Sequence, residues 1–396
     1  MAEWIDCKIA DLGTVIGGAT PSTRKLEYYE NGSIAWITPK DLSIFRGRYI
    51  RRGERNITEI GLKSCSTQLL PKNTVLFSSR APIGYIAIAE NELCTNQGFK
   101  SVIPNENTDP LFLYYLLKYN KNKIENMGSG TTFKEVSGNT LKNILVSVPR
   151  DKKVQEQISS ILGAIDNKIE SNEKINNNLE RQAEALFHSL FVDNVNPIWK
   201  DGVLSDLGTV VAGGTPSKTK PEYYSKKGIA WITPKDLSLN KSKFISHGEI
   251  DISELGFSKS SAIKMPSGTV LFSSRAPIGY IAIAANEVTT NQGFKSVVPN
   301  ENVGTAFMYY LLKFLLPTIE GMASGSTFKE ISGAGMKSIP VVIPDNETID
   351  KFNAFCTPIF RQQEVLEAEN SRLVDIRDAL LPKLMAGDLD VSSIEL

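Results

Sequence analysis

Residues 74–89 read TVLFSSRAPIGYIAIA, and the same sixteen residues return unchanged at 269–284, 195 positions later. Two further stretches repeat at the same offset, IAWITPKDLS at 34–43 and 229–238, and NQGFKSV at 96–102 and 291–297. The chain of 396 residues therefore holds two copies of one globular unit. Two like units carry two like surfaces, so the expected ligand has two like sites.

Each copy is predicted to be a mixed α/β domain, because short β-branched and aromatic runs alternate with Gly and Pro. The expected strands of the first copy are 34–37, 74–77, 83–89 and 101–104. A helix is expected at 109–118, with a capping Asp followed by Pro at its first position, and 305–313 repeats it. Glycine-rich loops at 17–22 and 128–134 flank these elements.

A long helix is predicted after each copy, since apolar residues recur there at three-four spacing. The predicted coiled-coil positions are Ile158, Ile161, Ile165, Ile175, Leu179 and Leu186 in the first helix, and Phe355, Ile359, Leu366, Leu373 and Leu380 in the second. The second helix is expected to kink or start late at Pro358 and to end at Pro382.

These patterns divide the chain into four segments, 1–150, 151–192, 193–344 and 345–396. The simplest packing makes the two helices an antiparallel coiled coil about a pseudo-two-fold axis, with one domain at each end of a rod. The alternative is two amphipathic helices that each pack on their own domain.

Charge differs between the segments although the net charge of the chain is zero. Lys+Arg against Asp+Glu number 19 to 14 in 1–150 and 15 to 12 in 193–344, but 5 to 7 and 5 to 11 in the two helical segments. A polyanion would be drawn to the two domains. Without a signal-like or membrane-spanning apolar run, a cytoplasmic protein is expected, and its four scattered cysteines are interpreted as reduced.

Catalytic motifs are missing from the sequence. There is no nucleotide-binding Gly-x-x-x-x-Gly-Lys-Ser/Thr or Gly-x-Gly-x-x-Gly loop, and no histidine is repeated beside Ser78 and Arg80. The sequence therefore predicts a binding protein without a metal or catalytic site. An enzyme that uses Ser78 with Arg80, and Ser273 with Arg275, remains an alternative.

Four stretches carry a family resemblance, DLGTVVAGGTPS at 206–217, WITPKD at 231–236, NQGF at 291–294 and RDALLPKLMAGD at 377–388. They resemble the specificity subunits of type I restriction–modification systems, and the similarity extends over essentially the whole chain. The resemblance implies two target recognition domains, 1–150 and 193–344, each reading one half of a bipartite site in double-stranded DNA. The helices would set the spacer and dock two modification subunits, which bring S-adenosylmethionine. Restriction subunits would bring ATP and Mg, and no cofactor or catalytic activity would belong to this chain.

The two copies are unusually alike, so inverted half-sites that are similar or identical are expected. The predicted DNA contacts are polar or basic loop residues present in both copies: Thr20, Ser22, Lys25, Lys40, Asp41, Arg80, Gln97, Ser129 and Lys134, with Thr215, Ser217, Lys220, Lys235, Asp236, Arg275, Gln292, Ser324 and Lys329. Lys and Arg would take phosphate or guanine, Asp cytosine, and Gln adenine. Structural alternatives are a cap for Asp41, an ion pair for Arg80 and a turn for Gln97. A duplicated protein-binding scaffold with a coiled-coil spacer is the alternative function.

Overall fold

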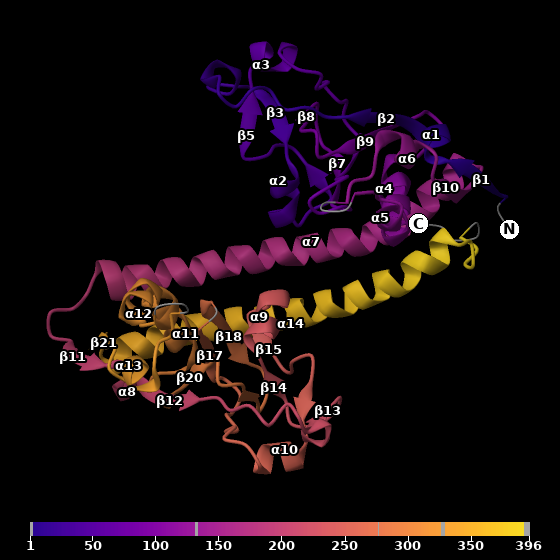
Figure 1. Ribbon diagram of the computed structural model, residues 1–396. Coiled ribbons are helices and arrows are strands. Elements are labelled where there is room, and N and C mark those ends of the chain that lie inside the picture. The colour runs from indigo at the N-terminus through magenta and orange to yellow at the C-terminus, as the bar shows by residue number, and fades with distance from the viewer. Residues whose placement is uncertain (1–2, 131–133, 276, 326–328, 392–396) are drawn as a thin grey trace. The chain divides into compact units, whose positions relative to one another are not determined.

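The computed structural model describes residues 3–130, 134–275, 277–325 and 329–391 (Figure 1). It consists of two compact units, one formed by Met1–Ser171 with Ser371–Leu396 and the other by Asn172–Asn370. We call them unit 1 and unit 2. The boundary crosses both long helices, α7 (Lys152–His188) and α14 (Asn346–Met385), so each unit holds one α/β domain and a part of each helix.

Unit 1 contains a five-stranded sheet of order β2-β9-β6-β7-β4, a three-stranded sheet of order β5-β3-β8, and the pair β1-β10. The strands are β1 Trp4–Lys8, β2 Gly13–Gly17, β3 Ile34–Ile37, β4 Tyr49–Ile50, β5 Arg55–Ile57, β6 Val75–Phe77, β7 Ile86–Ala89, β8 Cys94–Thr95, β9 Lys100–Pro104 and β10 Leu145–Pro149. The helices of the domain are α1 Ile9–Leu12, α2 Pro39–Ile44, α3 Glu59–Lys63, α4 Pro110–Tyr119, α5 Lys121–Asn126 and α6 Gly138–Lys142.

The centre of the larger sheet is covered on both faces. All three residues of β6 are fully buried, which explains why this strand reads as a continuous apolar run instead of alternating. Helix α4 packs on β6 and β7, and its cap is the predicted one, since the Asp109 carboxylate accepts from Phe112 N at 2.7 Å. The mixed α/β prediction is confirmed.

Unit 2 repeats this architecture with the five-stranded order β12-β20-β17-β18-β15 and the pairs β13-β16, β14-β19 and β11-β21. The strands are β11 Lys200–Val203, β12 Gly208–Ala212, β13 Tyr224–Ser225, β14 Trp231–Ile232, β15 Phe244–Ile245, β16 Asp251–Ile252, β17 Val270–Ser274, β18 Ile278–Ala284, β19 Thr289–Thr290, β20 Lys295–Pro299 and β21 Pro340–Ile343. The helices are α8 Leu204–Leu207, α9 Pro234–Leu239, α10 Glu254–Ser258, α11 Thr305–Phe314, α12 Leu316–Met322 and α13 Gly333–Lys337.

The two long helices are confirmed, but the second one neither starts late at Pro358 nor ends at Pro382. A kink at Pro358 stays a prediction. Helix α14 begins at Asn346 and continues past Pro358 and Pro382 to Met385. A proline removes one backbone hydrogen bond from a helix. Buried side chains on either side of each proline, such as Cys356 and Ile359 beside the first, hold the flanking turns in place.

In unit 1 the first part of α7 and the end of α14 both enter the core of the domain. Ile158 and Leu162 of α7 share one buried cluster with Leu381 and Leu384 of α14 and with the residues of α4. Unit 2 is built in the same way, because Ala183 and Phe187 from the end of α7 join Phe352 and Phe360 of α14 in its core. The helices thus pack on the domains as well as on each other.

Two predicted coiled-coil positions are not in this buried stripe. Ile175 and Phe355 are 43% and 42% exposed, whereas the neighbouring Ala183 and Phe352 are fully buried. The heptad pattern assumed a helix partner alone. The domains also cover these helices, so the buried face of each helix differs from the one that a strict heptad predicts.

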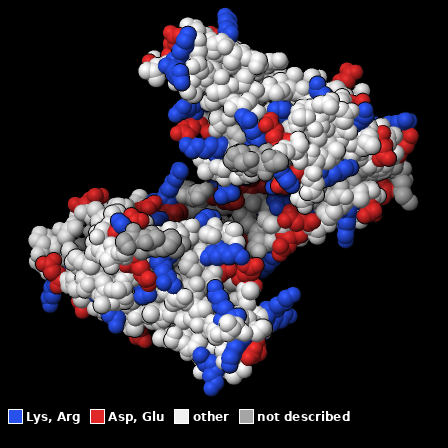
Figure 2. All heavy atoms as spheres, viewed as in Figure 1, with Lys and Arg blue, Asp and Glu red and all other residues white. Residues whose placement is uncertain are grey.

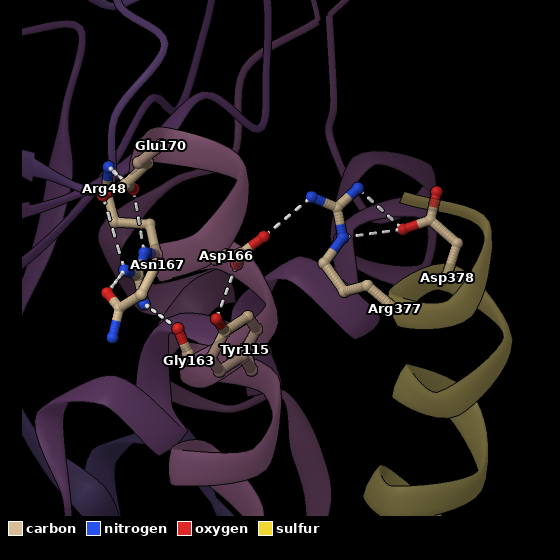
Figure 3. A network of polar contacts seen from close by, with 8 residues as sticks. All are labelled: Arg48, Tyr115, Gly163, Asp166, Asn167, Glu170, Arg377 and Asp378. Atoms are coloured by element: carbon tan, nitrogen blue, oxygen red, sulfur yellow. Dashed lines mark hydrogen bonds and ion pairs between the residues drawn. The ribbon is translucent and has the colours of Figure 1, made fainter. Parts of the chain in front are cut away.

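A buried polar network joins α7 and α14 in unit 1 (Figure 3). The Tyr115 hydroxyl donates to Asp166 at 2.6 Å, and Arg377 of α14 donates to the other oxygen of the same carboxylate at 2.9 Å. Arg48, only 4% exposed, donates from Nε to Glu170 at 3.0 Å and also contacts Asn167 and the Gly163 carbonyl. Burial and the neighbouring Asp166 both raise the pKa of Tyr115, so its hydroxyl stays protonated and donates.

Unit 2 carries a second network on different residues. Glu180 of α7 accepts from the Tyr310 hydroxyl at 2.9 Å and from Lys313 at 2.8 Å, and it pairs with the buried Lys243. Lys243 stands where unit 1 has Arg48 and also donates to Gln363 of α14 at 2.7 Å. Burial alone would raise the pKa of Glu180, but the two lysines outweigh burial and lower it to about 2.

Polar contacts also show the direction of the two helices within unit 2. The Asn172 amide, fully buried, donates to Asn370 and to Glu369, both at 2.8 Å. Gln363 donates to the Asn176 carbonyl at 3.2 Å. Since the residue number rises along α7 while it falls along α14, the helices are antiparallel in this unit.

Candidate nucleic-acid interface

A glycine-rich loop and a pair of aromatic rings form the base of the site in each unit. In unit 2 the Trp231 indole donates to the Gly214 carbonyl at 3.0 Å, and the Tyr224 hydroxyl donates to the Pro216 carbonyl at 2.7 Å. The two rings meet edge to face, with centroids 5.8 Å apart. Trp36 and Tyr29 make the same contacts in unit 1. These hydrogen bonds therefore hold in place the glycine-rich loop that carries the predicted contacts.

The strand end after each tryptophan is held by a capped short helix. One Asp41 carboxylate oxygen accepts from Thr38 N at 2.7 Å, and the other accepts from Glu54 N at 2.7 Å. Asp236 makes the equivalent bonds. Asp41 and Asp236 are both 8% exposed. The hydrogen bonds thus show the capping role that the sequence left open, and a base contact by these two carboxylates stays a prediction.

Lys40 and Lys235 lie on the surface beside this cap. Their ammonium groups pair with Glu54 and Glu249 at 2.8 and 2.6 Å, and all four side chains are more than 60% exposed. Exposed pairs of this kind contribute at most about 1 kcal/mol, so a nearby phosphate can compete for either lysine.

These elements enclose a pocket of about 630 Å³ in unit 2. Its lining residues are Thr215, Lys218, Tyr224, Trp231, Thr233, Pro234, Lys235, Asp236, Glu249, Ile250, Arg275, Asn291, Gln292 and Gly293. Five residues that the sequence singled out separately, from four different segments of the chain, meet in this one pocket: Thr215, Lys235, Asp236, Arg275 and Gln292.

The two predicted arginines each take part in an ion-pair triad. Arg80 pairs with Glu135 at 3.6 Å, and Lys100 pairs with the other oxygen of the same carboxylate at 3.5 Å. Arg275, Glu330 and Lys295 repeat the arrangement at 3.5 Å for both pairs. The structural alternative is therefore present. Both arginines are still about a third exposed, and each triad holds two cations and one anion.

In each unit the second glycine-rich loop lies next to the ion-pair triad. Backbone bridges join Ser129 to Glu135 and Arg80 to Glu135, and Ser324, Glu330 and Arg275 repeat them. Ser129 is exposed, and so is Lys134, which precedes Glu135 in the chain. Ser324 and Lys329 are likewise exposed. Loop positions 131–133 and 326–328 lie outside the described residues.

Gln97 and Gln292 differ in their contacts, although the residues that flank them in the sequence are identical. Thr20 donates to the Gln97 side chain in unit 1. In unit 2, within the described residues, the buried Thr215 hydroxyl has no hydrogen-bond partner. The predicted Ser22, Lys25, Ser217 and Lys220 are exposed on the rim of the first loop.

Sequence reasoning did not select several residues of the site. Tyr29 and Glu54, and the two residues Lys218 and Ile250 of the pocket lining, were not chosen. The internal repeat could have identified two of these residues, because Tyr29 and Glu54 recur in the second copy as Tyr224 and Glu249. The alternative nucleophile Ser78 is fully buried, donates to the Pro82 carbonyl at 2.8 Å and accepts from Tyr85 N at 2.7 Å.

The charge on the visible face of each unit is mixed. Figure 2 shows Lys and Arg side chains interspersed with Asp and Glu, so the net positive charge of the domains is not gathered in one field on that face. Among the described residues, no group of three or more His, Cys, Asp or Glu side chains could hold a metal ion. None of the described helices combines the length and apolar character needed to span a bilayer.

Comparison with known proteins identifies the family. A family model for the type I restriction modification DNA specificity domain matches residues 1–181 and again 198–368. The MjaIX specificity subunit of Methanocaldococcus jannaschii is 34% identical over 99% of this chain and 95% of its own length. The HindI specificity subunit of Haemophilus influenzae is 24% identical over 98% of this chain and all of its own.

A solved structure shares the fold. The S subunit of a type I restriction–modification system from M. genitalium aligns with a TM-score of 0.64 at 19% identity, over 97% of this chain and 96% of that one. The family model covers both copies of the repeat, and the M. jannaschii relative covers almost the full length. The chain therefore belongs to the family of type I restriction–modification specificity subunits.

Proposed function

We propose that each unit reads one half of a bipartite DNA site through the face that contains the pocket, and that the two half-sites are similar and inverted. The observation that carries the proposal is the convergence of Lys235, Arg275 and Gln292 on one pocket. Their counterparts Lys40, Arg80 and Gln97 stand at the same positions of the other copy. Phosphate contacts position a protein on DNA, and base contacts supply the sequence preference.

The chemistry of the exposed groups suits this division. Arg80 and Arg275 can present a bidentate fork to guanine, while the exposed Lys40 and Lys235 suit phosphate. Gln97 can pair with adenine through its amide, as can Gln292. DNA phosphate or a base edge would replace the weak, partly solvated ion pair that each arginine makes with its triad glutamate.

The helices are proposed to pair along their length as an antiparallel coiled coil that sets the spacer between the half-sites. The buried Asn172 and the Asp166–Arg377 pair support a fixed register, because polar groups in an apolar stripe tolerate few alternative pairings. Exposed apolar side chains on the helices, including Ile175 and Phe355, are candidates for docking modification subunits.

Partner subunits are proposed to supply all chemistry. Two modification subunits would bring S-adenosylmethionine for adenine methylation, and restriction subunits would bring ATP and Mg. The chain would act in the cytoplasm, where the DNA to be methylated lies, and its own contribution would be to select the site.

The test is binding of the full chain with its modification subunits to duplex DNA at several salt concentrations. The affinity should fall steeply as salt rises, because phosphate contacts release counterions. Arg80→Ala and Arg275→Ala should each weaken binding and reduce the salt slope by about 1 if the arginine meets phosphate, or relax the preference at one base if it meets guanine. A protein-binding scaffold would show neither effect.

The matched control is Lys351→Ala, which removes a cation that is 69% exposed on α14 and pairs with Glu347. This variant should bind DNA as the unaltered chain does. Sequencing of methylated adenines in cells with and without the chain gives a second measurement. Loss of methylation at one bipartite motif is expected when the chain is deleted, and unchanged methylation would contradict the proposal.

A further inference from the structure

The residues that line the pocket of unit 2 differ from their counterparts in unit 1 at only two positions. Of the fourteen residues that line the pocket of unit 2, all but Lys218 and Ile250 are the same at the equivalent positions of unit 1, where Thr23 and Arg55 stand instead. The chain around them has diverged much further, since residues 55–72 and 250–267 agree at five of eighteen positions.

This identity is not explained by packing alone. Lys40, Glu54 and Gln97 are exposed, and so are their counterparts in the second copy, so a core constraint does not hold them. The two units share exposed polar residues around the same tryptophan–tyrosine ring pair, and this indicates a common ligand. The two substituted positions then mark where the ligands of the two units differ.

Arg55 stands beside Trp36 in unit 1, because the two residues are partners in the register of β3 and β5. Burial raises the pKa of the Tyr29 hydroxyl, and the nearby positive charge of Arg55 offsets part of that rise. The Arg55 side chain is exposed and makes no ion pair or hydrogen bond with any residue that the structure describes. A guanidinium with all five donors available is suited to a base edge with two acceptors.

Ile250 occupies the same place in unit 2 with the opposite chemistry. It lines the pocket beside Trp231 and is 48% exposed. An isoleucine there offers no donor, and its exposed methyl groups would gain free energy by covering another apolar group. In the major groove that group is the 5-methyl of thymine, whereas guanine presents its N7 and O6 acceptors to an arginine.

We propose that Arg55 and Ile250 make the two units read different bases at one equivalent position of otherwise matching half-sites, guanine in the half-site of unit 1 and thymine in that of unit 2. The inference rests on the proposed function of the pocket face. It identifies one position at which the inverted repeat of the target is broken, and the residue pair that breaks it.

The experiment selects binding sites from a duplex library, randomised across both half-sites, with the full chain bound to its modification subunits. The unaltered complex should select half-sites that differ at this position. Arg55→Ile should lower the preference for guanine there by about tenfold to a hundredfold and yield thymine, which makes the two half-sites alike. Ile250→Arg should make both half-sites carry guanine there, and the double exchange should restore two different half-sites, which give the same duplex sequence as the unaltered complex bound in the opposite orientation.

Arg52→His is the matched control, because it exchanges a neighbouring exposed residue for its counterpart in the second copy at a position outside the pocket lining. It should leave the selected sequence unchanged. If Arg55→Ile weakens binding to all duplexes equally, Arg55 contacts phosphate and the inference fails while the proposed function stands. If the unaltered complex selects no bipartite site, the proposed function itself fails.

Discussion

Replacing Glu180 by alanine should destabilise unit 2 by about 3–5 kcal/mol, the usual cost of leaving a buried charge without its partner. Lys243 has a side chain only 6% exposed, and without Glu180 its ammonium group keeps hydrogen bonds to the neutral Gln363 and Tyr310 side chains, at 2.7 and 3.4 Å, and its contacts with aromatic rings. The lowered pKa of Glu180 gives a second value for the free energy that this carboxylate contributes. A carboxyl with a pKa of about 2 in place of 4.5 is worth about 3 kcal/mol, since each unit of pKa corresponds to about 1.4 kcal/mol.

The assay is urea unfolding, combined with hydrogen exchange of peptides from each unit. Glu180→Ala should speed exchange in peptides from unit 2 more than in those from unit 1. Glu184→Ala is the control, because Glu184 is 43% exposed and its ion pair is with the partly exposed Lys313, at 3.3 Å, so its loss should cost about 1 kcal/mol or less. Equal losses for the two variants would refute the reasoning.

A double variant separates the charge from the packing. Glu180→Ala with Lys243→Met removes both charges and retains an apolar side chain of similar length. Its unfolding free energy should exceed the value expected from adding the two single losses, because no unpaired charge is left in the core.

The pH dependence follows the same ion pair. A lowered pKa in the folded state gives a contribution that is fully present above pH 4.5, the ordinary value, and is lost as the pH falls towards 2. The difference in unfolding free energy between the unaltered chain and Glu180→Gln should therefore shrink over that interval. A difference that stays constant from pH 6 to pH 2 would contradict the assignment.

Two further pairs of variants test the packing, each by urea unfolding. Gly387→Ala should destabilise unit 1 by about 1–3 kcal/mol, because Gly387 has φ +77° and a Cβ there would lie 2.7 Å from the Trp4 ring, whereas Gly321→Ala in helix α12, with no atom within 4 Å of its Cβ, should be neutral or stabilising. Leu179→Asp should cost about 2 kcal/mol or more, since Leu179 packs against the core of unit 2, while Ile175→Asp, at a position 43% exposed, should cost less than about 0.5 kcal/mol. Opposite rankings in either pair would show that the packing faces are assigned incorrectly.

Local signals in the sequence were sufficient for much of each domain. The strand at 34–37 and the capped helix that begins at Pro110 follow from residues adjacent to them. Strand ends were less predictable. The identical sequences at 83–89 and 278–284 form strands that begin at Ile86 in one unit and at Ile278 in the other, so the surroundings set the ends.

Long-range packing was the larger gap. The heptad pattern showed that two helices exist, but not that each is shared between two units, because periodicity does not record which surface covers a stripe. At the site, repetition identified Arg80 and Lys40 but could not show which residues meet. Ile250 was missed because an isolated isoleucine in a loop has no polar signature, although its exposure in the structure makes it conspicuous.

The core of the domain in unit 1 includes residues from the end of α14 and from the segment that follows it. Leu381, Leu384 and Val391 are at most 8% exposed in the core that contains α4 and the start of α7, and Gly387 lies against Trp4. During translation, a nascent chain must leave this apolar surface open until residues 381–391 have emerged from the ribosome. A premature stop near residue 380 would thus damage the domain that was synthesised first, and cotranslational folding can secure unit 2 earlier than unit 1.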